Sequence, residues 1–436
     1  MTDQEIKEEV LINGYNENGE MKSKKSKFSL YIISAISTSA NFIARAYTGL
    51  YAVAIGSSAT ALSLITALRN LIQQVFQFTF GRISDRIGRK IMMIIGLIIS
   101  GISVGLFPLI RNEWVLVVGV VAFSIGFACY YPSFTALQGD ITNKKNRAGL
   151  IGIITIFGAF ATLIFLILVG LFGNLGETNL QQYQIILLIV AGLFLISTIV
   201  TIFLRDPPRK KLTEKKTFSF DPLRKNKEFR KFVIANSIVA FAMSLGWPIY
   251  PIIRGAYASA SENSWIWAAF TALQIIILLI TRKIIDKMGR KKLLFIGRLL
   301  MFYVPLNMTI ILIFQLPWWH FIFAGALSGA CNAFYMVGQS SYILDSASEK
   351  EKGTYMGVHN LFIGLSTFLG SLLMGILADF LIERYAYNVW LVLIIITAVI
   401  ALMRFITSFS FLFLKEPVQT KEYDDEPFDE QAVVNL

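Results

Sequence analysis

Twelve long apolar runs divide this chain, and each is long enough to cross a lipid bilayer as a helix. Such a helix needs about 20 mostly apolar residues. Hydrophobic residues make up 55% of the 436 positions and charged residues only 16%, so this composition cannot supply a water-soluble surface. A soluble multidomain enzyme is therefore excluded. We place the spans near residues 28–51, 59–81, 90–110, 114–138, 149–173, 182–204, 231–254, 264–281, 293–315, 317–342, 354–381 and 388–414.

Lysine and arginine fall almost entirely on one side of the expected bundle. With an even number of spans, both termini share a side with the loops that follow the even-numbered spans. The opposite side carries only Arg111, Arg254 and Arg384. Since basic loops stay cytoplasmic, we expect a plasma-membrane protein with both termini in the cytoplasm. Topology and contact with anionic lipid also explain the net charge of +12, so no nucleic-acid partner is expected.

A ten-residue loop pattern occurs once in each half of the chain. Residues 81–90 read GRISDRIGRK, and residues 282–291 read RKIIDKMGRK. A second correspondence places Asp140 and Arg147 after the fourth span, and Asp345 and Lys352 after the tenth. Two parallel six-span halves are a known transporter architecture. The chain is therefore expected to consist of a tail 1–27, a bundle 28–204, a linker 205–230, a bundle 231–414 and an acidic tail 415–436.

With these features the chain resembles the major facilitator superfamily of secondary transporters over roughly residues 28–414. The first loop copy matches the family pattern GxxxD(R/K)xGR(R/K) at every fixed position, whereas Arg282 replaces the first glycine of the second copy. The resemblance implies an all-α membrane protein of twelve transmembrane helices in two six-helix bundles related by pseudo-twofold symmetry. It also implies a monomer that moves a small-molecule substrate across the lipid bilayer by alternating access, without a cofactor or metal.

The resemblance further implies that the loop pattern latches the cytoplasmic helix ends and biases the inward–outward equilibrium. From the residues themselves, Gly81 would let two helix ends approach closely, and Gly88 would adopt a positive φ. A plain turn with cytoplasmic anchors is the alternative. The latch residues would be Gly81, Asp85, Arg86, Gly88, Arg89 and Lys90 in the first half, Asp286, Gly289 and Arg290 in the second, and Asp140, Arg147 and Asp345 as partners.

Polar residues recur at helical spacing in several spans. In lipid, such side chains must face protein or a water-filled cavity, so the rows predict a central cavity; hydrogen bonds between packed helices are the alternative. The resemblance implies a lining by spans 1, 4, 7 and 10, while the nearly apolar spans 3 and 6 would face lipid. The candidate lining residues are Thr38, Asn41, Arg45, Arg69, Asn70, Gln73, Tyr131, Gln138, Asn332, Tyr335 and Gln339.

Span 7 contains the sequence Trp247-Pro248-Ile249-Tyr250-Pro251 near its outer end. Each proline removes a backbone donor and displaces the carbonyl four residues earlier, so the helix should bend or break there. Trp247 and Tyr250 would then add aromatic surface to an outer gate of the cavity. A packing kink that does not move is the alternative.

Arg45 and Arg69 lie within spans, where a buried arginine costs at least about 2.5–3.5 kcal/mol. No acidic residue occurs at matching depth, which favours an anionic or carboxylate-bearing solute. Snorkelling or capping of carbonyls is the alternative for both arginines. Arg298 and Arg404, on peripheral spans, are expected to be structural.

The lack of a midplane carboxylate also bears on coupling, because proton-driven transporters commonly relay protons through such groups. Proton/drug antiport is not supported, and facilitated diffusion or anion exchange is as plausible, with a counter-anion or a coupling proton. His359 is a candidate relay, and a hydrogen-bonded packing residue is the alternative. A proton-coupled multidrug or sugar transporter of the same family is the alternative, followed by a non-transporting membrane receptor. No nucleophile–base or metal-ligand cluster occurs at one depth, so an enzyme is not expected.

Overall fold

The computed structural model describes residues 24–140, 147–204, 219–348 and 351–417, and the secondary structure in these ranges is helical. The first half consists of α2 (Lys24–Ala54), α3 (Ala59–Ile87), α4 (Arg89–Leu106), α5 (Glu113–Asp140), α6 (Arg147–Phe172) and α7 (Asn179–Ile202). The short α8 (Asp221–Lys225) precedes the second half. That half consists of α9 (Lys227–Ser244), α10 (Ile249–Tyr257), α11 (Ala260–Met288), α12 (Arg290–Leu299), α13 (Tyr303–Phe314), α14 (His320–Asp345), α15 (Lys352–Arg384) and α16 (Val389–Ser408).

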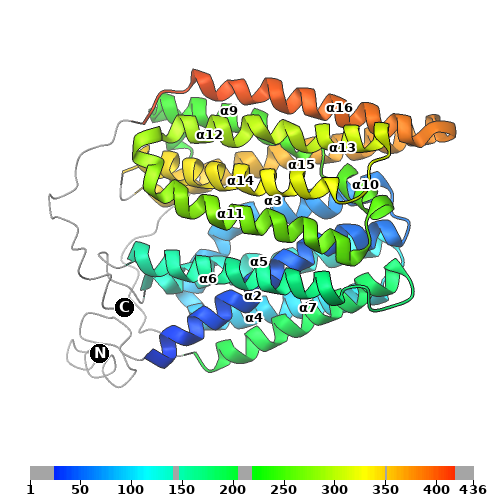
Figure 1. Ribbon diagram of the computed structural model, residues 1–436. Coiled ribbons are helices and arrows are strands. Elements are labelled where there is room, and N and C mark those ends of the chain that lie inside the picture. Colours follow the sequence, from blue (N-terminus) through cyan, green and yellow to red (C-terminus); the bar gives the residue numbers. More distant parts are fainter. Residues whose placement is uncertain (1–23, 141–146, 205–218, 349–350, 418–436) are drawn as a thin grey trace, which may run out of the picture.

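The long helices run up and down between two faces of a bundle (Figure 1). We call the face where α2 begins and α16 ends the tail face, and the opposite one the far face. Helices α2 and α4–α7 lie along one side of the bundle, and α9 and α11–α16 lie along the other. Helix α3, the sixth span of the first half, packs on α5 and faces α15 of the second half. Two six-span bundles are thus present, as the sequence predicts.

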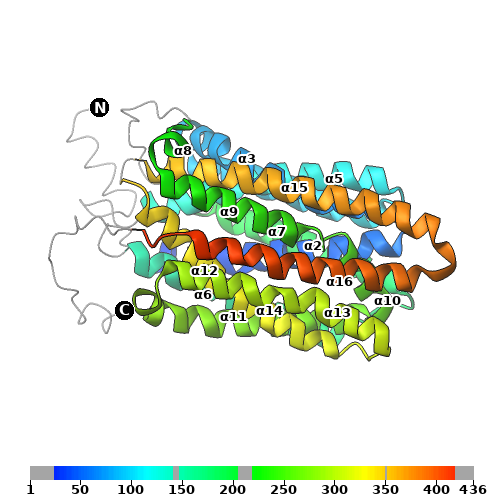
Figure 2. The same cartoon turned by 90° about the horizontal axis from the view of Figure 1, so that it is seen from above.

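Among the described residues, ten segments are long and apolar enough to cross a membrane. One of them joins α9 to α10, and another joins α12 to α13. Helices α2 and α3, of 31 and 29 residues, run beside these ten in both views (Figure 2). The two remaining spans are therefore long helices that carry the polar rows of the first half.

Helices α4 and α7 present apolar side chains to the outside of the bundle, as expected for lipid contact. Ile98, Ile102, Leu188 and Ile199 are all exposed. The opposite side of α4 packs tightly on α5, because a Cβ on Gly96 would lie 2.5 Å from the Gly126 carbonyl oxygen. Small residues allow this close approach of two membrane helices.

The two halves meet along α3 with α15, α6 with α11, and α2 with α10. Hydrogen bonds join them at the far face. The Asp379 carboxylate accepts from the backbone N–H groups of Ala59 (2.7 Å) and Thr60 (2.8 Å), at the start of α3. Tyr47 donates to the Ala260 carbonyl (2.8 Å). Helices α6 and α11 diverge from the far face toward the tail face (Figure 1).

Candidate functional site

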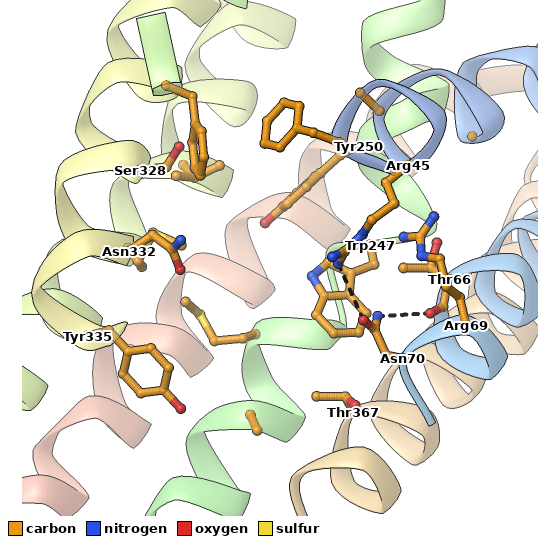
Figure 3. A pocket seen from close by; sticks show the side chains of 18 of the residues that line it. Arg45, Thr66, Arg69, Asn70, Trp247, Tyr250, Ser328, Asn332, Tyr335 and Thr367 are labelled. Carbon is orange, nitrogen blue, oxygen red and sulfur yellow. Dashed lines mark hydrogen bonds between the residues drawn. The ribbon is translucent and has the colours of Figure 1, made fainter. Parts of the chain in front are cut away.

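A cavity of about 640 Å³ lies between the two halves. Residues of α2 and α3 line it on one side, and residues of α9 to α16 line it on the other (Figure 3). Binding sites for small molecules commonly enclose about 300–1,000 Å³. The cavity therefore has room for a solute the size of a drug or a metabolite.

Most of the residues predicted to line a cavity do line this one. They come from α2, α3, the break in span 7, α10 and α14. The predicted residues that the structure places around the cavity are Asn41, Arg45, Arg69, Asn70, Trp247, Tyr250, Asn332, Tyr335 and Gln339. Their place in the cavity supports the use of polar rows at helical spacing as a signal for spans 1, 2 and 10.

Two predicted lining residues of spans 1 and 2 do not belong to the described cavity lining. A Cβ on Gly158 of α6 would lie 3.2 Å from the Thr38 hydroxyl, and Ser34 donates to the Ile154 carbonyl of α6 (3.0 Å). The early part of this row therefore joins α2 to α6. Gln73 is buried away from the cavity, and its neighbour Gln74 lines it instead.

The prediction for span 4 was wrong, because α5 contributes no described residue to the cavity lining. The Tyr131 ring stacks on Phe127 at 5.9 Å on the same helix. Thr135 donates to the Tyr131 carbonyl, and Gln138 is buried near the tail face. Tyr131 and Thr135 are exposed and Gln138 is buried, and none of the three belongs to the described lining.

Three arginines of the second half line the cavity although the sequence did not place them there. Arg254 was assigned to the far surface, but the break in span 7 starts the new helix α10, which carries its side chain inward. Arg298 and Arg404 were expected on peripheral helices. The lining described by the structure thus contains five arginines and no aspartate or glutamate.

Each of these three cavity arginines lies near an aromatic ring. The Arg254 guanidinium lies 4.7 Å from the centre of the Trp267 ring. That of Arg298 lies 3.3 Å from the centre of the Tyr335 ring, and Arg404 lies 5.3 Å from the centre of the Tyr250 ring. Such contacts stabilise a desolvated cation by up to about 2 kcal/mol.

Arg404 also caps the predicted break in span 7. Helix α9 ends at Ser244, and the Trp247 N–H bonds to the Ser244 carbonyl instead of the Met243 carbonyl. Arg404 donates to that released Met243 carbonyl (2.6 Å) and to the carbonyl of Met301 (3.3 Å). Buried carbonyls need a donor, and this arginine supplies it.

Among the described residues, no aromatic ring lies against the two cavity arginines of the first half. Arg45 donates to the Asn70 side-chain oxygen at 3.4 Å, and the Asn70 amide donates to the Thr66 carbonyl at 2.9 Å (Figure 3). Arg69 is only 6% exposed, and its buried Nε has no hydrogen-bond partner among the described residues.

His359 belongs to a hydrogen-bond chain beside the cavity. Tyr335 donates to the Asn236 side-chain oxygen (2.9 Å), so the Asn236 amide must donate to His359 Nε2 (2.7 Å). His359 Nδ1 then carries the proton and donates to Asn360 (3.2 Å). The chain satisfies both nitrogens of a neutral imidazole.

In the first loop copy, the described bonds join the end of α3 to the start of α4. Arg89 forms an ion pair with Asp85 and donates to the Ser84 hydroxyl (2.7 Å). Gly88 has φ +123°, which confirms the predicted positive φ. The reason given for Gly81 was wrong: a Cβ there would lie 3.9 Å from Pro132, which is ordinary contact. Arg86 is exposed and Lys90 is half-buried.

The second loop copy is bonded to other segments. Arg290 donates to Asp345 of α14 at 2.8 Å. Glu416 accepts from the backbone N–H groups of Arg290 (3.1 Å) and Lys291 (2.9 Å), so it caps the start of α12. Gly289 has φ +79°, and a Cβ there would lie 2.5 Å from Glu416 Oε1. The side chains of Asp140, Arg147 and Asp286 lie outside the described residues.

The sequence did not indicate Glu416 as a cap of α12, because it lies after the last span with no periodic pattern around it.

A family model for the Major Facilitator Superfamily matches residues 28–236 and 232–432. The chain belongs to this superfamily. It is an integral membrane transporter, and the family binds small-molecule substrates.

Relatives with different named activities share this fold. The chain is 24% identical over 338 residues to the quinolone resistance protein NorA of Staphylococcus aureus (strain MSSA476), an alignment that covers 76% of this chain and 84% of NorA. The nucleoside transporter NupG superposes with a TM-score of 0.70 at 14% identity, over 89% of this chain and 98% of that one. A D-xylose–proton symporter superposes with a TM-score of 0.64 at 13% identity, over 91% and 98%. The structural matches establish the fold alone.

Proposed function

We propose that this transporter moves an organic anion with an apolar or aromatic body by alternating access. The observation that carries the proposal is the charge of the cavity lining, which has five arginines and no acidic residue in the described structure. Charges in a low-dielectric site interact far more strongly than in water. A carboxylate or phosphate would neutralise part of this charge, whereas a cation would add to it.

The remaining lining supports a solute with an apolar part. Trp247, Tyr250, Trp267 and Phe270 give the cavity a wall of aromatic rings. Aromatic side chains offer large apolar contact areas and stack on flat ligands. An aromatic carboxylate or aromatic phosphate matches both features, the charge and the rings.

The bonding at the far face supports an alternating-access cycle. Asp379 holds the start of α3 from the other half, and Ser264 of α11 donates to the Leu166 carbonyl of α6 (2.8 Å). The basic loops favour a cytoplasmic tail face. We therefore take this state as inward-facing, and opening to the outside would break these bonds between the halves.

A second candidate is proton-coupled transport of a drug or a sugar. The names of NorA as a quinolone resistance protein and of the D-xylose–proton symporter favour it. The cavity lining favours the anion, because no described lining residue is a carboxylate that could relay a proton or attract a cation.

A thermal-shift panel with the purified protein separates the two candidates. Phthalate and phenyl phosphate supply anions on an aromatic ring, and benzyl alcohol and benzylammonium supply neutral and cationic counterparts. We expect the two anions to raise the unfolding midpoint and benzylammonium to leave it unchanged. Stabilisation by benzylammonium with no response to either anion would overturn the proposal in favour of the second candidate.

A further inference from the structure

Two of the five cavity arginines belong to the first half of the molecule, and three belong to the second half. In the second half, Arg404 is bound by the Met243 and Met301 carbonyls, and Arg254 and Arg298 lie against Trp267 and Tyr335. These three guanidiniums already have partners that spread or accept their charge. An incoming anion would have to compete with those contacts.

Arg45 and Arg69 have no comparable partners in the part of the chain that the structure describes. The one hydrogen bond of Arg45 is long and goes to a neutral amide oxygen. Arg69 is buried, and among the described residues neither arginine forms an ion pair or lies against an aromatic ring, whereas an unbonded Nε is common to Arg69 and the three arginines of the second half. A guanidinium offers five N–H donors, so this pair carries a large unused donor capacity.

The two positive charges also lie close enough to interact with each other. Figure 3 shows both arginines beside Asn70, at the wall formed by α2 and α3. Two guanidiniums held together without an anion repel each other, and a carboxylate or phosphate between them would accept several charge-assisted hydrogen bonds.

We infer that the anionic group of the solute binds between Arg45 and Arg69, on the wall formed by the first half. Asn70 is a positioning residue, because it is fixed by the Thr66 carbonyl and holds Arg45 in turn. The apolar body of the solute lies against Trp247 and Tyr250 of the second half (Figure 3). One solute thus contacts both halves, and its head group is recognised by one of them. This inference rests on the proposed function.

Isothermal titration calorimetry in detergent micelles tests this placement. Phthalate and phenyl phosphate are titrated into the wild type and into Arg69→Gln, Arg45→Gln and Arg298→Gln. We expect Arg69→Gln and Arg45→Gln to weaken anion binding by at least about tenfold, as for loss of a charge-assisted bond, and Arg298→Gln to weaken it by only about twofold. The ratio of the dissociation constants for phthalate and phenyl phosphate tells whether a carboxylate or a phosphate is preferred.

Two further measurements keep the inference falsifiable. Arg69→Lys keeps the charge, so it should recover most of the affinity lost in Arg69→Gln, and benzyl alcohol should bind Arg69→Gln as it binds the wild type if the cavity is intact. Full affinity in Arg69→Gln with strong loss in Arg298→Gln would overturn the placement and leave the proposed function standing. Failure of the wild type to bind either anion would instead overturn the proposed function.

Discussion

The two halves of this transporter share the same pattern of spans and loops, yet they bond their charges differently. The second half ties Arg404 to two carbonyls and Arg290 to Asp345 on another helix. In the first half, Arg89 pairs with Asp85, and Arg45 and Arg69 have neither an ion pair nor an aromatic ring against them among the described residues. We propose that this difference reflects a division of labour, in which the second half holds its charges with its own groups and the first half keeps donors for a ligand.

The largest expected contrast is between the same substitution in the two halves. Arg404→Met removes the donor for the buried Met243 carbonyl, so we expect it to lower the free energy of unfolding by about 1–3 kcal/mol. Arg69→Met removes a buried charge that no described residue compensates, so its unfolding midpoint should equal or exceed that of the wild type. Thermal unfolding in detergent checks both. Equal loss of stability in the two variants would remove the contrast.

Breaking the ion pair of the second loop should lower the free energy of unfolding more than breaking that of the first loop. This difference should be smaller than the one between the two arginine variants. Asp345→Asn breaks a bridge between α12 and α14, and we expect a loss of about 1 kcal/mol. Asp85→Asn breaks a pair that joins the end of α3 to the start of α4, and we expect a loss of only about 0.5 kcal/mol. We nevertheless expect Asp85→Asn to lower transport with normal membrane insertion, if the first loop works as a latch. Wild-type uptake by properly inserted Asp85→Asn protein would remove that role.

Glu416→Gln tests whether the chain beyond α16 holds the second loop. The variant keeps hydrogen-bond acceptance by one oxygen but loses the negative charge at the start of α12. Charge at a helix terminus is worth about 0.3–1 kcal/mol, so a small drop in the unfolding midpoint is expected at low salt, shrinking as salt is raised. A drop that does not change with salt would argue against a charge-based cap.

The smallest effect is expected at Tyr250. Its hydroxyl is buried without a partner among the described residues, while its ring lies near Arg404. Tyr250→Phe should therefore leave the unfolding midpoint and anion binding nearly unchanged, because the ring remains. A marked loss of phthalate affinity in this variant would show that the hydroxyl, rather than the ring, contacts the solute.

Span positions, the break near Pro248 and the positive φ of Gly88 were predictable because each has a local cause. Apolar length, a missing backbone donor and the glycine backbone act within a few residues of sequence. The row through Asn41 and Arg45 was predictable for a related reason, since helical spacing places these residues on one side of α2.

Which polar residues face the cavity depends on how the helices are rotated and placed relative to one another. A polar row shows that one side of a helix is satisfied by protein, but it does not tell whether a neighbouring helix or a cavity satisfies it. Thr38 lies beside α6, and Tyr131 is packed on its own helix, although both belong to such rows. Arg254 reaches the cavity on the helix that begins after the break in span 7, and Arg404 donates to a carbonyl at that break. Glu416 reaches α12 through a contact distant in sequence.

The most direct test of the central claim is uptake of radiolabelled phthalate by proteoliposomes, measured beside protein-free vesicles. A cavity lined by five arginines and no acid in the described structure predicts time-dependent uptake above the protein-free rate, and loss of that uptake in Arg69→Gln. Phthalate entry at the protein-free rate, together with protein-dependent entry of benzylammonium, would contradict the account.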